Sequence, residues 1–534
     1  MRKSFLWKCL TGIGLAAIAA FGCSEGALAA PPNAKKWVQP YELTNTAAPR
    51  MAIDRLVKAK LDRYNIQPAA LCSDEVFVRR AHLDLTGMIP RASDVRAFMA
   101  DKRKDKRDRL INKLLDSDAY ADYWALKWCD VLRVKAEFPI NLWPNGVQAY
   151  YRWVHHAMTT NMRYDEFARL MLTSSGSNFR EPPVNFYRAM QGKDAHAIAR
   201  SVGLTFMCTR VEEWDQAEQK NIDAFFSRVK FKGTAEWKEE IVMNDPAAIG
   251  DLLARFPGGR QVDIPEGDDP RAVFADWLIT KDNPWFARAI ANRIWAWVFG
   301  KGIVEEVDDM GPHNPPNNPE LLDHLADELV KSGWDIKQLI RTICRSRTYQ
   351  QSSILRSEHE HAEKLFAAYP VRRLDAEVLS DVLVYLFGGR ERYMSMVPEP
   401  FTFVPPSNHS VMIEDGSITS QFLEMFGKPS RDTGLMNERS NKPTPSQKLH
   451  LLNSSSVQDR ISKSTRLKAI VKIAGQKPGP IAEMVYINLL SRKPTAKEKQ
   501  IAIKYIGNNR KQFFQGAVDL TWALVNTKEF LYRH

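Results

Sequence analysis

Apolar positions recur at helical spacing along the first half of the chain. The segment RDRLINKLLDS, which begins at Arg107, places its leucine and isoleucine side chains on one face, as an amphipathic helix requires. The segment that follows carries a large apolar side chain at every fourth position from Tyr120 to Leu132. Aromatic stripes of this kind are typical of a packed core. The pattern predicts a first domain of successive helices over residues 51–230.

Helical spacing returns in the second half, where the helix starts are well marked. Asn283 precedes Pro284 and Asn318 precedes Pro319, which places an N-cap residue before a proline at the first helical position. Apolar residues three and four positions apart follow each start, and a glycine ends each helix. The pattern predicts a second helical domain over residues 269–534.

The two predicted domains are separated by a segment without helical periodicity. Residues 231–268 contain the string FPGGRQVDIPEGDDP, in which proline, glycine and aspartate are concentrated. Such composition favours turns over helices and leaves room for a short pair of strands. The sequence therefore predicts a mainly α-helical, two-domain protein with a short irregular or β-containing linker.

The first 29 residues have the plan of a secretory signal peptide. Basic residues precede an apolar run that ends at Gly22, and small residues follow, including ALA at 27–29. Cleavage there would leave an N-terminal extension over residues 30–50. Cleavage before Cys23 would leave a lipid anchor instead, but Phe21 fits a lipoprotein signal poorly. We predict a periplasmic or cell-surface protein without a membrane span after processing, because no later segment is long and apolar enough.

Charge indicates the kind of partner. The full chain has a formal net charge of +12, and removal of residues 1–29 takes away three positive charges and one negative charge, which leaves +10. A basic protein outside the cytoplasm does not meet nucleic acid, so the positive charge favours an anionic polysaccharide or another anionic envelope component. A binding or scaffold protein for such a polysaccharide is the first functional hypothesis.

The segment GKGIVEEVDDMGPHNPPNNP at 300–319 is a long connection that concentrates functional groups. Loops held by rigid elements often carry function, and acids beside a histidine suit acid–base chemistry or a hard cation. A loop that merely caps the next helix is the alternative. A hydrolytic enzyme is the second functional hypothesis, with catalytic groups Asp308, Asp309 and His313 and ligand-binding groups Arg288, Asn292, Arg293 and Asn314.

Other motifs with chemical meaning are missing from the sequence. It contains no phosphate-binding glycine loop, no dinucleotide fingerprint, no Gly-x-Ser-x-Gly elbow and no metal motif with fixed spacing. We therefore expect no cofactor and no resident metal.

Four cysteines remain after cleavage by the soluble route, each beside apolar or aromatic neighbours. Buried free thiols are the simplest interpretation. An oxidising compartment would permit disulfides, so their pairing stays open, and a redox protein is a third hypothesis that needs one close pair. The four are Cys72, Cys129, Cys208 and Cys344.

Long strings of the chain resemble a bacterial family with two paired domains of unknown function, numbered 1549 and 1553. VRRAHLDLTG and KWCDVLR resemble the first domain, and NPPNNPELLDHLADEL and LLSRKPTAKE resemble the second, over about residues 50–505. The resemblance implies an exported cell-envelope protein of a family often joined to cytochrome c-type or carbohydrate-binding modules. It implies no activity.

Two motifs of the family are incomplete in this chain. The family typically has Cys-x-x-Cys-His followed by His-Pro, of which only Cys208 stands here, and a Cys-x-Cys where Leu435 and Asn437 stand. Cys-x-x-Cys-His is a haem c attachment motif, which one cysteine cannot reproduce. The resemblance therefore implies that Cys208 is the remnant of a site lost as a unit, without haem or thiolate-bound zinc.

Overall fold

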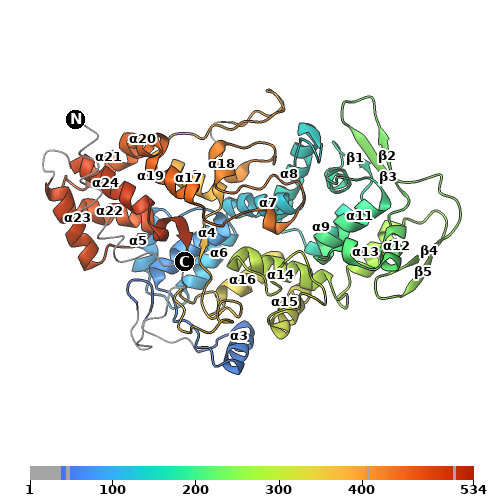
Figure 1. Ribbon diagram of the computed structural model, residues 1–534, viewed down its shortest axis with the longest axis horizontal. Coiled ribbons are helices and arrows are strands. Elements are labelled where there is room, and N and C mark those ends of the chain that lie inside the picture. The colour runs from blue at the N-terminus through green and yellow to red at the C-terminus, as the bar shows by residue number, and fades with distance from the viewer. Residues whose placement is uncertain (1–37, 44–47, 406–407, 509–512) are drawn as a thin grey trace.

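The computed structural model describes residues 38–43, 48–405, 408–508 and 513–534 (Figure 1). Within these residues the protein is mainly α-helical, and its strands form small sheets of two or three, which confirms the predicted fold class. The predicted signal peptide at 1–29 and the candidate lipid-anchor residue Cys23 lie outside the described residues.

The first half consists of helices connected by short turns. Its α-helices are α3 (Ala52–Arg63), α4 (Asp74–Thr86), α5 (Ala92–Ala100), α6 (Lys106–Leu115), α7 (Asp118–Val131), α8 (Trp143–Thr160), α9 (Tyr164–Thr173), α10 (Asn185–Arg188), α11 (Ala195–Val202) and α12 (Gln216–Ala224). Shorter turns are η2 (Pro182–Val184), the π-helical η3 (Gly203–Met207) and η4 (Val211–Glu213). The predicted aromatic stripe lies on α7, where Trp124 and Trp128 are fully buried.

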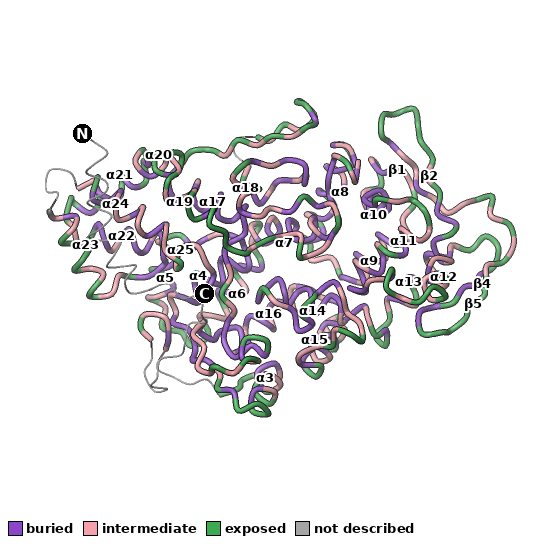
Figure 2. Tube along the Cα trace, in the orientation of Figure 1, coloured by how far each residue is buried: buried purple, intermediate pink, exposed green. Residues whose placement is uncertain are grey.

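Antiparallel hairpins occupy the predicted linker. Strand β3 (Glu240–Asn244) lies between β2 (Val229–Gly233) and β1 (Gly176–Ser177), with Phe231 opposite Val242. A second hairpin joins β4 (Leu252–Arg255) to β5 (Gln261–Ile264). Figure 2 shows that this second hairpin is largely exposed, whereas α4 and α7 are buried along most of their length.

The second half is again helical. Its α-helices are α13 (Pro270–Leu278), α14 (Phe286–Phe299), α15 (Pro319–Lys331), α16 (Ile336–Arg345), α17 (Ala376–Phe387), α18 (Gln421–Met425), α19 (Pro445–Asn453), α20 (Ser455–Lys463), α21 (Thr465–Ile473), α22 (Pro478–Leu490), α23 (Ala496–Asn508), α24 (Phe513–Val525) and α25 (Lys528–Leu531). Turns η5 (Ser410–Met412) and η6 (Met436–Glu438) and the paired strands β6 (Arg372–Arg373) and β7 (Tyr532–Arg533) complete it.

The expected helix starts differ slightly from those observed. Asn318 accepts a hydrogen bond from the Leu321 amide, and α15 begins at Pro319 as expected. The Asn283 carboxamide accepts bonds from the amides of residues 285 and 286, so it closes a turn, and the regular helix α14 begins only at Phe286.

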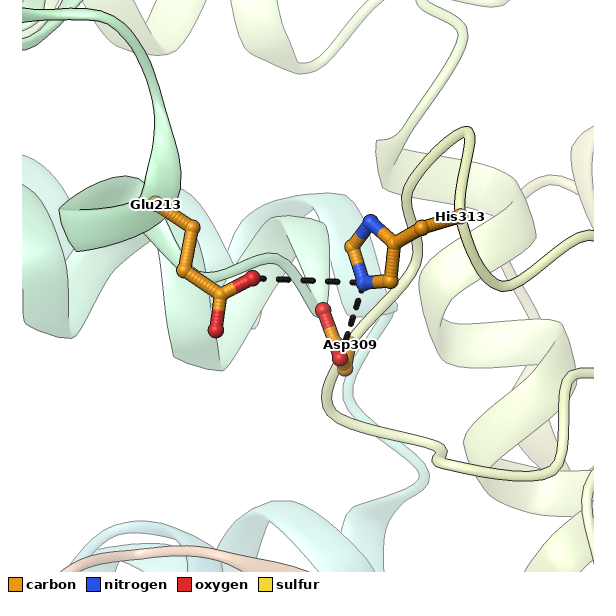
Figure 3. A group of neighbouring side chains, drawn as sticks. All are labelled: Glu213, Asp309 and His313. Atoms are coloured by element: carbon orange, nitrogen blue, oxygen red, sulfur yellow. Dashed lines mark hydrogen bonds and ion pairs between the residues drawn. The ribbon is translucent and has the colours of Figure 1, made fainter.

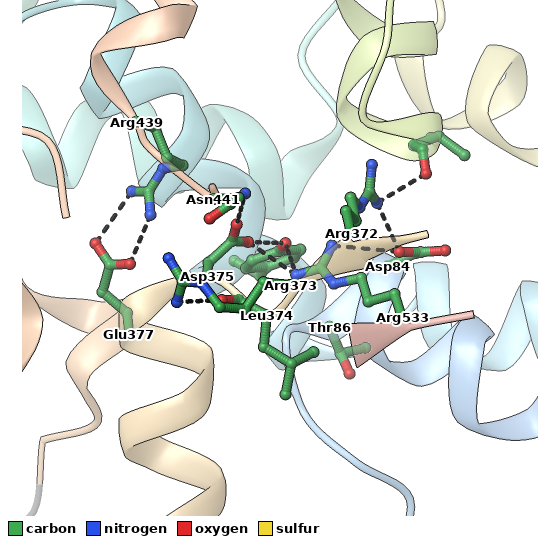
Figure 4. A network of polar contacts seen from close by, with 12 residues as sticks. Asp84, Thr86, Arg372, Arg373, Leu374, Asp375, Glu377, Arg439, Asn441 and Arg533 are labelled. Atoms are coloured by element: carbon green, nitrogen blue, oxygen red, sulfur yellow. Dashed lines mark hydrogen bonds and ion pairs between the residues drawn. The ribbon is translucent and has the colours of Figure 1, made fainter. Parts of the chain in front are cut away.

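A buried polar network joins the two halves (Figure 4). The Asp84 carboxylate of α4 accepts hydrogen bonds from the hydroxyls of Tyr349 and Tyr369, at 2.9 and 2.8 Å. It also pairs with Arg372 at 2.8 Å and with Arg533 at 3.2 Å. Strand β7, near the C-terminus, is thereby held against a helix of the first half.

A second set of ion pairs crosses between the halves from α7. Asp130 accepts from the guanidinium of Arg431 at 2.9 Å and from that of Arg439 at 2.7 Å, and Arg439 also pairs with Glu377 of α17 at 2.6 Å. The rings of Trp124 and Trp128 contact Trp297 of α14 edge-on. The halves on either side of residues 231–268 therefore share one core, and their division into domains stays a prediction.

Candidate functional site

The 300–319 connection is held by the helix that precedes it. Helix α14 ends at Gly300, and the fully buried Asn292 side chain accepts hydrogen bonds from the Ile303 and Val304 amides at 2.7 and 3.0 Å. Its own amide group donates to the Val304 carbonyl at 3.2 Å. Asn292, predicted as a ligand-binding residue, has its polar atoms occupied in shaping the loop.

A buried ion pair lies beneath the loop. Arg293, with none of its side chain exposed, donates to Asp308 at 2.7 Å and to the Thr205 carbonyl at 2.6 Å. The second oxygen of Asp308 accepts from the Met436 amide at 2.6 Å. The structure places Asp308 in this pair and not at the surface, so its carboxylate is already neutralised and hydrogen bonded.

Cys208 lies beside this pair. It is fully buried in the left-handed conformation at the end of η3, with a φ of 49°, and its thiol donates to the Ala289 carbonyl at 3.7 Å. Burial raises the pKa of the Cys208 thiol to about 12, so the thiol is neutral at physiological pH. The Cys208 carbonyl accepts from the Met310 amide at 2.6 Å, which ties η3 to the loop.

Asp309 and His313 meet at the surface, together with a residue from the first half (Figure 3). His313 Nε2 lies 3.1 Å from Asp309 Oδ2 and 3.9 Å from Glu213 Oε2 of η4. Figure 3 shows both carboxylates directed at the same ring nitrogen. The hydrogen bond and negative charge of Asp309, with a smaller contribution from Glu213, raise the pKa of His313. We call these three residues the Glu213–Asp309–His313 cluster.

The remaining predicted residues lie around this cluster without joining it. The Asn314 amide group donates to the Asp309 and Glu306 carbonyls at 2.9 and 3.2 Å and so fixes the turn. Arg288 forms an exposed ion pair with Asp323 of α15. Of the three acid–base groups predicted from sequence, Asp309 and His313 are therefore brought together, and Asp308 points into the interior.

The comparisons with known proteins match two successive segments of the chain. Residues 52–230 match a family described as a protein of unknown function, DUF1549, and residues 270–506 match one described as a protein of unknown function, DUF1553. The chain is a tandem DUF1549–DUF1553 protein. This confirms the resemblance seen in the sequence. No curated protein and no solved structure matches the chain.

The Glu213–Asp309–His313 cluster contains residues from both matched segments. Glu213 belongs to the DUF1549 segment, and Asp309 and His313 belong to the DUF1553 segment. Glu213 was missed from the sequence because nothing in the 211–213 turn indicates which distant loop it faces. Its position a few residues after Cys208 was the only available signal.

Both segments with incomplete cysteine motifs contact the Arg293–Asp308 ion pair. Arg293 contacts the carbonyls of Leu204 and Thr205 before Cys208, and Asp308 contacts the Met436 amide between the positions of the missing Cys-x-Cys. The structure thus brings into proximity two segments that the sequence analysis associated with one lost site.

A second site, which sequence reasoning missed, lies on α21 and at the start of α22 in the DUF1553 segment. Between Asp459 and Glu483 every charged residue is a lysine or an arginine. Five of them are exposed, and within the described residues four of these five have no carboxylate partner, the exception being Lys463, which pairs with Asp459. We call these four the α21 basic surface: Arg466, Lys468, Lys472 and Lys477.

Two hollows flank the α21 basic surface. One, of about 450 Å³, is lined by Lys468 and Lys472 of α21, by Gln476 after α21, and by Phe514 of α24. The other, of about 390 Å³, is lined by Arg466 together with Arg91 before α5, Tyr385 of α17 and Asn488 of α22. Each hollow thus combines cations, an aromatic ring and an amide. A run of basic residues without acidic ones was the sequence signal for this surface.

None of the described helices is long and apolar enough to cross a bilayer.

The four described cysteines lead to a testable expectation. All four are buried and none is in a disulfide, and burial raises the pKa of Cys129 and Cys208 to about 12. We expect the protein starting at residue 30 to give no reaction with Ellman's reagent at pH 8 while folded, and four equivalents in guanidinium chloride, because only the exposed thiolate reacts. Rapid reaction of any thiol in the folded protein would contradict this expectation.

Proposed function

We propose that this protein is exported and binds an anionic polysaccharide of the cell envelope or its surroundings through the α21 basic surface. The observation that carries the proposal is the set of four exposed cations, none of which has a carboxylate partner among the described residues, beside two hollows. The signal-peptide pattern at residues 1–29 and the positive net charge of the chain support it.

The electrostatics of the surface suit a polyanion. Exposed lysines paired with carboxylates contribute little to ligand binding, because an incoming anion must first compete with the internal partner. In the part of the chain that the structure describes, the cations of the α21 basic surface have no such competitor, so a sulfate or carboxylate can contact them directly and release its counterions. About 1 kcal/mol per cation is a reasonable scale for attraction to an anionic surface.

The aromatic residues of the two hollows suit a sugar. Arg466 lies over the Tyr385 ring at 4.0 Å, and Lys468 lies over the Phe514 ring at 5.8 Å. The cation–π contact restrains the cation beside an apolar face. A sugar ring can pack its C–H face on the aromatic side chain while its acidic substituent reaches the cation, as in concave sites that combine apolar walls with a few placed polar groups.

Retention on glycan columns tests the proposal. The protein from residue 30 onward is expected to bind heparin and alginate columns at low salt and to elute as salt rises. The variant Lys468→Gln/Lys472→Gln should bind at least about tenfold more weakly, because two cations at about 1 kcal/mol each are lost. The measurement is the glycan affinity at fixed low salt, together with the elution salt concentration.

The matched control removes the same charge elsewhere. Lys232 and Lys238 are exposed lysines of the β2–β3 hairpin, which lies at the opposite end of the molecule from α21 (Figure 1). Lys232→Gln/Lys238→Gln should leave the affinity nearly unchanged. Absence of retention on both glycans, or equal weakening by the two double variants, would refute a specific role for the α21 basic surface.

A further inference from the structure

We propose that the Glu213–Asp309–His313 cluster is a binding site for a divalent cation of the Zn²⁺ type. The proposal is independent of the α21 basic surface and concerns another part of the molecule. It assigns a ligand to the one place in the described residues where three metal-ligating side chains come within reach of a common point.

The spacing of the donor atoms is the first argument. Nε2 of His313 is 3.1 Å from Asp309 and 3.9 Å from Glu213, and the three donor atoms all lie within 4.8 Å of one another. Zn²⁺ with ligands at about 2.0–2.2 Å in tetrahedral arrangement requires donor atoms about 3.4 Å apart. The widest donor pair must therefore close by at most about 1.4 Å, and the half-exposed side chains of Glu213 and His313 can make this movement.

The charge and type of the donors are the second argument. Two carboxylates and a neutral imidazole carry two negative charges, which a divalent cation would neutralise. Ca²⁺ and Mg²⁺ favour all-oxygen ligands, whereas a set that includes imidazole favours Zn²⁺ and related metals. Three protein ligands at an exposed position leave at least one coordination position for water or for a ligand oxygen.

The backbone around the cluster is the third argument, because it fixes the two ligand-bearing segments relative to one another. The Met310 amide, next to Asp309, donates to the Cys208 carbonyl at 2.6 Å, and Cys208 leads into the turn that ends at Glu213. The Asn314 amide group holds the Asp309 carbonyl from the other side. A cation at this point would bridge the DUF1549 and DUF1553 segments.

Calorimetric titration with zinc chloride tests the proposal. The protein from residue 30 onward, stripped with chelator, is expected to bind one equivalent of Zn²⁺ and to melt at a higher temperature in its presence. Glu213→Gln, Asp309→Asn and His313→Ala should each weaken binding at least about tenfold. The first two changes keep the side-chain shape, and melting without metal should show that all three variants remain folded.

The control addresses adventitious zinc binding. His359 and His361 form another neighbouring pair, with ring centroids 5.2 Å apart. His359→Ala/His361→Ala should leave the one-equivalent binding unchanged. The proposal is overturned if no stoichiometric Zn²⁺ binding occurs, or if binding survives the cluster variants and is lost in this double variant. Tighter binding of Ca²⁺ than of Zn²⁺ would overturn the assigned metal class. Glycan retention is a separate measurement, so the two proposals fail independently.

Discussion

Replacement of Asp84 by alanine is expected to destabilise the protein by about 3–5 kcal/mol or more, the typical effect of removing one partner from a buried ion pair. The carboxylate is fully buried and receives hydrogen bonds from two tyrosine hydroxyls as well as the guanidinium groups of Arg372 and Arg533. Its loss leaves two buried arginines short of their counter-charge. Arg533 keeps its second ion pair, with Asp375, whereas Arg372 is left with its hydrogen bond to the Val298 carbonyl, so the contacts of Arg372 should loosen first.

A surface aspartate provides the matched control. Asp323 pairs with Arg288 where both side chains are nearly half exposed, so Asp323→Ala should change stability by less than about 1 kcal/mol. The measurement is the guanidinium chloride midpoint of each variant by circular dichroism. Equal midpoints for Asp84→Ala and Asp323→Ala would show that the network drawn in Figure 4 does not hold the halves together.

Replacement of Arg293 by methionine is expected to have the second largest effect, again about 3–5 kcal/mol. The change leaves the Asp308 carboxylate buried beside the Met436 amide alone and removes the donor from the Leu204 and Thr205 carbonyls. Each group left without a partner costs its own desolvation free energy. The loop and η3 should therefore loosen together.

A double-mutant cycle separates the ion pair from the other contacts. In Arg293→Met/Asp308→Leu both charges are gone, so the total loss of stability should be smaller than the sum of the single losses by 1 kcal/mol or more, on the order seen for coupled pairs. Strictly additive losses would show that the two side chains are not coupled. Asp309→Leu, on the exposed side of the loop, should cost less than Asp308→Leu.

Much of the local structure could be predicted from the order of residues. The aromatic stripe on α7 and the apolar positions of α6 and α15 are buried as their spacing indicated. The cap at Asn318 is confirmed, whereas the cap expected at Asn283 is wrong: its side chain closes a turn, and α14 begins two residues later than expected, at Phe286. Hydrophobic periodicity and capping act over a few residues, which is why they can be read without a structure.

The candidate sites include features that could not be predicted from the sequence. Asp308 and Asp309 are neighbours in the sequence, yet one is buried against Arg293 and the other faces solvent beside His313. No periodicity distinguishes them, since an irregular loop has none. The α21 basic surface was readable in principle from its run of cations, but its aromatic neighbours Tyr385 and Phe514 come from other helices.

The sequence by itself determined the helical class, the buried faces of α6, α7 and α15 and the resemblance to the DUF1549 and DUF1553 families, because each rests on residues close together or on long ordered strings. The tertiary structure alone decided that Glu213 meets His313, that Asp84 holds the C-terminal strand, and that two aromatic rings flank the cations of α21. The physical reason is the range of the interactions: ion pairs and metal-ligand geometry depend on distances of a few ångströms between segments far apart in the chain, and those distances arise only when the shared core packs.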